Sequence, residues 1–167
     1  MPHPSLGYPP PDPTAGHVAA ATRIRREHVR LGRLALEATS RLDPTFSTRY
    51  DQVALRLFLR DFERHLEQLA RALETGSDTF VVQYGEWLVP VYRHRDVPMR
   101  DFTLMLVGLR DAAATVLAPD EVVALTELID RWRARLKHHG RLGGDHKGNS
   151  IVRFFWKAAG IGDDSVI

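Results

Sequence analysis

The residues best suited to chemistry in this chain are two histidines set among aromatic side chains. His94 ends a segment that carries Tyr84 and Trp87, and His65 follows Phe62 in an earlier segment. A neutral imidazole can bind iron, and aromatic rings can line the faces of a flat macrocycle. These residue types are the ones that a pocket for a flat, iron-binding macrocycle would need.

Each side chain of this predicted pocket has its own role. His94 is the first candidate for a haem iron ligand, and His65 is the candidate on the opposing helix. Arg93 and Arg95 flank His94, and a guanidinium can hold a propionate through two parallel hydrogen bonds. The aromatic residues expected to stack on the ligand are Phe58, Phe62, Tyr84 and Trp87.

Other groupings of polar residues match no catalytic or metal motif. Asp61 and His65 lie four residues apart, but helical di-iron sites use a Glu-x-x-His motif twice and this chain does not supply it. We therefore interpret Asp61 and His65 as a surface pair. The sequence also has no Gly-rich phosphate loop after a strand and no nucleophile elbow, so we expect no enzyme activity.

The composition limits the class of protein further. A chain of 167 residues suits one domain, and its apolar residues are interrupted by charges too often for a membrane span. The absence of cysteine excludes disulfides, thiolate zinc sites and a thioether-linked cofactor. The net charge of +2 gives no reason to expect a nucleic-acid partner. We expect a cytoplasmic protein, and we expect any cofactor to be bound non-covalently.

The apolar pattern predicts an all-α fold in three parts. Residues 1–15 are rich in proline and should form an extended arm. Residues 16–140 should form the helical domain. Residues 141–167 should form a Gly-rich loop and then a short C-terminal helix and tail, with Ile151–Trp156 as its apolar part.

Helical spacing sets the approximate bounds of the main elements. The expected helices span residues 16–40, 46–75, from a cap at Ser77 or Asp78 to about 95, from Asp96 or Pro98 to about 117, and 119–138. Pro90 should bend the third of these, because it has no N–H to donate to the carbonyl of Glu86. In the last two, the residues expected in the core are Phe102, Met105, Leu106, Leu109, Ala113, Val116, Val122, Leu125, Leu128, Ile129, Trp132 and Leu136.

The order of features from Tyr84 to Leu136 resembles the second half of a globin. A ligand-bearing helix is followed by the corner Asp96-Val97-Pro98, then by a helix that carries Phe102 near its start, then by a long final helix. The resemblance covers roughly the central two thirds of the chain. It implies a globin-like helical sandwich of about five main helices plus a short C-terminal helix, with the ligand between the second and third main helices.

The position of His94 differs from the globin pattern. In haem-binding globins the proximal histidine precedes the corner proline by about eight residues, which is Pro90 here, whereas His94 precedes Pro98 by four. The resemblance therefore extends to cofactor-free sensor globins of bacterial stress signalling, to phycobiliproteins and to globins associated with bilin biosynthesis. Without cysteine, a bilin would be held non-covalently.

Two functions follow from these observations. The first is a sensor or binding protein that holds haem or a linear bilin between the second and third main helices. The alternative is a cofactor-free globin-like signalling or dimerisation module, in which the aromatic residues fill the core. A homodimer is expected in either case, and the partner would belong to a signalling or bilin-metabolism system.

Overall fold

The computed structural model describes residues 16–140, and every regular element in that range is a helix. The expected all-α fold is confirmed. The six helices of this range are α1 (Val18–Leu42), α2 (Phe46–Arg49), α3 (Gln52–Thr75), α4 (Thr79–His94), α5 (Met99–Ala114) and α6 (Pro119–Gly140). The proline-rich arm at 1–15 and the C-terminal helix expected within 141–167 lie outside the described residues.

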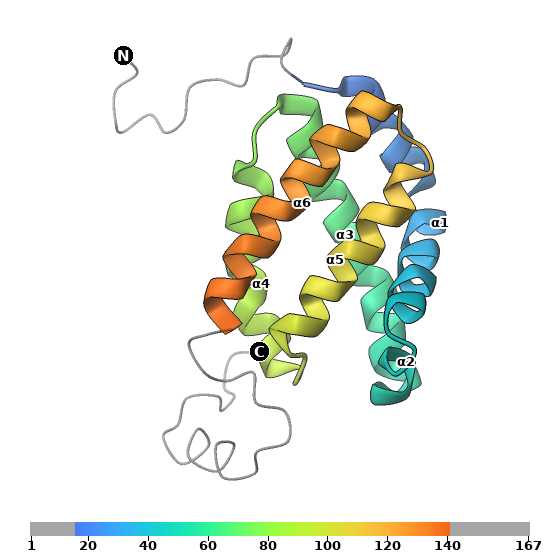
Figure 1. The fold of residues 1–167 in the computed structure, drawn as a ribbon, viewed down its shortest axis with the longest axis vertical. Coiled ribbons are helices and arrows are strands. Elements are labelled where there is room, and N and C mark those ends of the chain that lie inside the picture. Colours follow the sequence, from blue (N-terminus) through green and yellow to red (C-terminus); the bar gives the residue numbers. More distant parts are fainter. Residues whose placement is uncertain (1–15, 141–167) are drawn as a thin grey trace.

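The long helices form two layers (Figure 1). α3 lies between α1 and α4 in one layer, and α5 and α6 pack across them in the other. α1 contacts both α3 and α5, while α6 contacts α4 and α5. This arrangement places the inward faces of α3 and α4 opposite α5 and α6.

The segment expected as one helix from 46 to 75 is two helices, so that prediction is wrong. Tyr50 and Asp51 both have extended backbone, which separates α2 from α3. Asp51 accepts a hydrogen bond from the N–H of Ala54 at 2.8 Å and so caps α3. The Tyr50 ring meets Phe58 edge-on, and its hydroxyl donates to Asp101. These contacts hold the break in place.

The core lies where the two layers meet. Nearly all the core residues predicted between 102 and 136 are buried, and only Val116, just after α5, and Val122 on α6 remain partly exposed. α1 and α5 approach closely at Gly108, where an added Cβ would lie 2.3 Å from Oγ1 of Thr39. The largest fully buried side chains include Trp132, Tyr92, Phe46, Phe58, Phe62 and Phe102. Aromatic packing therefore fills much of the space between the layers.

Candidate functional site

A buried histidine joins α3 to α4. His65 is fully buried on the inward face of α3, and its two ring nitrogens reach tyrosine hydroxyls of α4. Nδ1 lies 3.1 Å from the hydroxyl of Tyr84, and Nε2 lies 2.9 Å from the hydroxyl of Tyr92. Both nitrogens of this predicted iron ligand therefore have hydrogen-bond partners within the protein.

The neighbouring groups determine which nitrogen carries the proton. Tyr92 donates its hydroxyl proton to Oδ2 of Asp61 at 3.1 Å, and Arg95 donates to the same oxygen at 2.6 Å. Because that proton is used, the Tyr92 oxygen accepts from N–H at Nε2 of His65. Nδ1 then accepts from Tyr84. The result is a continuous hydrogen-bonded chain, Tyr84–His65–Tyr92–Asp61–Arg95, which we call the His65 chain.

Burial keeps the imidazole of His65 uncharged. Burial, followed by the positive charges of Arg95 and Arg64, lowers the pKa of His65 to about 3. Burial also raises the pKa of both Tyr84 and Tyr92, with the Asp61 carboxylate adding to the effect. The imidazole and both phenols are therefore uncharged at neutral pH. Arg95 balances the Asp61 carboxylate, which is the only carboxylate in the His65 chain.

Aromatic side chains from α3 and from the opposite layer surround His65. The rings of Trp132 on α6 and Phe102 on α5 have centroids 5.5 and 5.6 Å from the imidazole, and Phe62 lies 6.4 Å away. Trp132 fits there because Gly85 has no side chain, since an added Cβ would lie 2.4 Å from the indole Nε1. The space between α3 and α4 that the sequence assigned to a ligand is occupied by these side chains.

The structure brings only some of the predicted site residues together. Phe58, Phe62 and His65 are fully buried on α3, and Tyr84 and Arg95 join them through the His65 chain. Hydrogen bonds within the protein thus occupy most of the polar groups in this set.

The remaining predicted site residues lie on the outer side of α4 or at its end. His94 is exposed at the last position of the helix, and Arg93 donates to the backbone carbonyl of His139 on α6 at 2.8 Å. Trp87 is 58% exposed. The buried stripe of α4 is instead Val81, Gly85, Leu88, Val89 and Tyr92.

Sequence patterns did not predict the roles of Asp61 and Tyr92 beside His65, or the contact of Trp132 with it. The interpretation of Asp61 and His65 as a surface pair is wrong, because both are buried and Arg95 neutralises the carboxylate. Their spacing of four residues does place them on one helical face. Tyr92 was assigned no role, and Trp132 was expected only as a core residue. No local pattern shows that α6 brings Trp132 against the imidazole.

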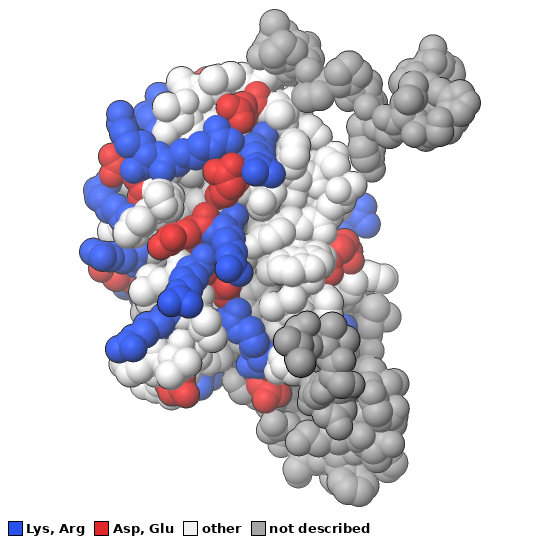
Figure 2. All heavy atoms as spheres, turned by 180° about the vertical axis from the view of Figure 1, so that it is seen from behind, with Lys and Arg blue, Asp and Glu red and all other residues white. Residues whose placement is uncertain are grey.

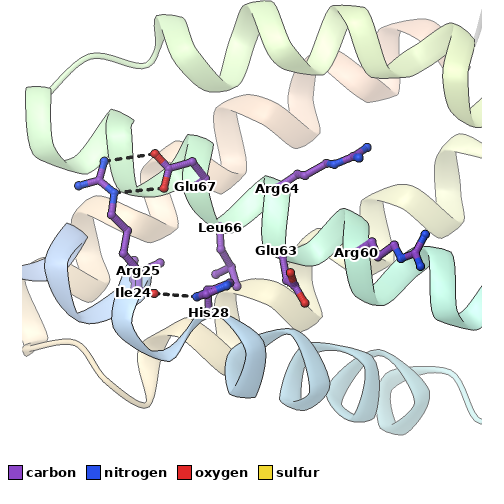
Figure 3. A pocket seen from close by; sticks show the side chains of 8 residues that line it. All are labelled: Ile24, Arg25, His28, Arg60, Glu63, Arg64, Leu66 and Glu67. Carbon is purple, nitrogen blue, oxygen red and sulfur yellow. Dashed lines mark hydrogen bonds and ion pairs between the residues drawn. The ribbon is translucent and has the colours of Figure 1, made fainter.

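A separate groove lies between α1 and α3 on the outer side of their layer (Figure 3). It has a volume of about 520 Å³, and its residues are Ile24, Arg25, His28, Arg60, Glu63, Arg64, Leu66 and Glu67. Arg25 crosses it and donates to both Glu67 and Glu74. Burial opposes ionisation of Glu67, but the hydrogen bonds from Arg25 and Arg71 outweigh it and lower the pKa of Glu67. These bonds tie α1 to α3.

The outer surface of this layer has two different parts (Figure 2). Charged side chains, many of them arginine, cover α1 and α3, whereas the neighbouring area over α4 is largely uncharged. Trp87 is the large exposed apolar residue of α4. A basic surface and an exposed aromatic residue therefore lie next to each other.

Comparison with protein-family models, curated proteins and solved structures gave no match to this chain. Between residues 16 and 140 no three His, Asp or Glu side chains gather closely enough to hold a metal ion. None of the helices in that range has the length and apolar character needed to cross a bilayer. The His65 chain and the outer surface are therefore the features of the described residues that bear on function.

Proposed function

We propose that this chain is a cofactor-free helical module that works by binding other protein chains, as in signalling or dimerisation. The observation that carries the proposal is the pair of hydrogen bonds at His65, which use both ring nitrogens. Aromatic side chains around the imidazole fill the remaining space. Phe58, Phe62 and His65, three of the residues predicted for a tetrapyrrole pocket, thus lie in the core.

Iron ligation at His65 would require several changes at once. Nε2 would have to lose its proton and its hydrogen bond to Tyr92, and the buried Tyr92 oxygen would then accept no hydrogen bond, which costs about 1–3 kcal/mol. A macrocycle would also have to displace Phe102 or Trp132 from the imidazole faces. These costs favour the cofactor-free function over tetrapyrrole binding.

The outer surface supports binding of another chain. Trp87 exposes 58% of its surface on α4, although burying it would remove a large apolar area from water. Trp, Tyr and Arg are enriched among the residues that contribute most of the binding energy at protein interfaces. The module therefore binds its partner at its outer surface rather than in its core.

Titration of the purified full chain with haemin and with biliverdin tests this proposal. Absorption is followed from the near ultraviolet to the far red, with a matched volume added to buffer. We expect no saturable shifted band with either compound. A band that saturates at one equivalent would overturn the proposal and support the tetrapyrrole alternative.

Two variants assign the ligand if such a band appears. His94→Ala removes the exposed histidine without touching the core, and His65→Gln removes the buried one while keeping a donor and an acceptor. A band lost only in His94→Ala would place the tetrapyrrole at the end of α4. A band lost only in His65→Gln would place it inside the core.

A further inference from the structure

One row of α3 presents three arginines to solvent beside the aromatic residues of α4. Arg56, Arg60 and Arg64 follow one another at intervals of four residues, so they lie along one side of the helix, and all three are exposed. Tyr84 and Trp87 lie on the neighbouring helix α4. We call these five residues the Trp87 surface.

The three arginines are available for a partner. None of them forms an ion pair with another residue in the part of the chain that the structure describes. The acids of α3 have other partners or directions: Glu63 points toward α1 (Figure 3), Glu67 and Glu74 bond to Arg25, and Asp61 pairs with Arg95. This side of α3 therefore has an uncompensated positive charge.

Arg64 connects this charge to the aromatic residues. Its side chain leaves α3 on the side away from α1, toward α4 (Figure 3). Its positive charge acts on Tyr84, opposing part of the rise in the pKa of that phenol. Arg64 is thus the member of the basic row that reaches toward the aromatic pair.

The aromatic pair is held in a defined position. The rings of Tyr84 and Trp87 stack with centroids 5.9 Å apart and planes 20° from parallel. Tyr84 is itself anchored by its hydrogen bond to the buried His65. A side chain fixed before binding loses less conformational entropy when a partner arrives. Trp87 is therefore a prepared anchor for an apolar group.

We propose that the Trp87 surface binds an acidic amphipathic helix of a partner protein, a proposal that rests on the cofactor-free function above. The apolar stripe of the partner packs on Trp87 and Tyr84, and its carboxylates pair with Arg56, Arg60 and Arg64. The arginine row spans about 12 Å along α3, which corresponds to roughly two turns of a partner helix.

Charge favours an acidic helix over two other possible occupants, which are a second copy of this protein and its own segment 141–167. A second copy related by a twofold axis would bring one arginine row against the other, which repels. The segment 141–167 has an apolar run, but Arg153 and Lys157 lie within and beside it. An acidic helix from another protein complements both parts of the surface.

Fluorescence anisotropy with labelled helical peptides tests the proposal on the full chain. The probes are synthetic 18-residue amphipathic helices whose apolar stripe is Leu, Phe or Met and whose other positions are Glu, each with a Lys counterpart of the same stripe. We expect saturable binding of at least one Glu peptide, weakened by added salt, and about tenfold weaker binding of its Lys counterpart.

Matched variants locate the binding. Trp87→Ala and the double variant Arg60→Glu, Arg64→Glu should each weaken the Glu peptide about tenfold or more. The controls on the opposite layer, Val123→Ala and Arg135→Glu, are also exposed and should leave binding unchanged.

Three results would overturn this proposal. They are no binding of any Glu peptide, equal binding of Glu and Lys peptides, and binding that Trp87→Ala leaves intact. Any of them, together with a negative haemin and biliverdin titration, would remove the acidic-helix partner but leave the cofactor-free function standing. A positive titration would instead overturn the cofactor-free function itself.

Discussion

His65 stabilises the fold only while it is uncharged. Its pKa falls from 6.5 to about 3 on folding, so below about pH 6.5 the unfolded chain binds a proton that the folded chain does not. The groups that face the imidazole are Tyr84, Tyr92 and Asp61, with Arg95 and Arg64 nearby. Stability is therefore lost as the pH falls.

This linkage predicts a pH dependence with a clear sign. Between about pH 6.5 and 5 the free energy of unfolding should fall by roughly 1.5 kcal/mol more in the natural chain than in His65→Gln. Glu67, Glu74 and Glu121 have lowered pKa values, so their stabilisation is lost at lower pH, below about 4.5. Urea unfolding at several pH values measures the difference. Equal slopes for the two proteins would contradict it.

A single glycine admits Trp132 to the imidazole. An added Cβ at Gly85 would lie 2.4 Å from the indole Nε1, whereas at Gly32 the nearest atom is 3.5 Å away. We expect Gly85→Ala to destabilise the fold by about 1–3 kcal/mol through overpacking. Gly32→Ala fits and should be neutral or stabilising by up to about 1 kcal/mol. Urea unfolding compares the two, and similar effects in both variants would contradict this explanation.

At the scale of elements, the break between α2 and α3 depends on one capping side chain. Asp51 accepts from the Ala54 N–H, so Asp51→Ala should destabilise the protein by about 1 kcal/mol, whereas Asp51→Ser should retain most of the stability. Thermal or urea unfolding measures both variants. An Ala variant as stable as the natural chain would show that tertiary contacts alone hold the start of α3.

Sequence reasoning succeeded where one helical face is uniformly apolar. The core stripes of α5 and α6 were predicted almost completely, because large apolar residues repeat on one side of each helix. The break at Tyr50 and Asp51 was missed because apolar spacing continues across it. The cap at Asp51 was the signal that could have revealed it.

The candidate site was harder to predict because its burial depends on distant residues. On α4 the largest aromatic, Trp87, faces solvent, while the small residue Gly85 faces the core and receives Trp132. Asp61 looked like a surface acid, yet Arg95, 34 residues away, neutralises it in a buried setting. Local spacing contains none of this information, since it arises only when α4 and α6 pack on α3.

At the scale of the whole molecule, core residues should determine the stability of the fold, and residues of the outer surface should determine partner binding. Because Trp87 is 58% exposed, Trp87→Ala should change the free energy of unfolding by no more than about 0.5–1 kcal/mol, even though it weakens peptide binding. Urea unfolding of this variant provides the check. A loss of several kcal/mol would mean that Trp87 is part of the core.

The most direct test of the cofactor-free core is the state of His65 itself. Long-range ¹H–¹⁵N spectra of the histidine rings, recorded at neutral pH before and after one equivalent of haemin, report which nitrogen carries the proton. We predict a neutral His65 ring protonated at Nε2, with signals that haemin leaves unchanged. A ring protonated at Nδ1, or His65 signals lost or strongly shifted by haemin, would contradict the account.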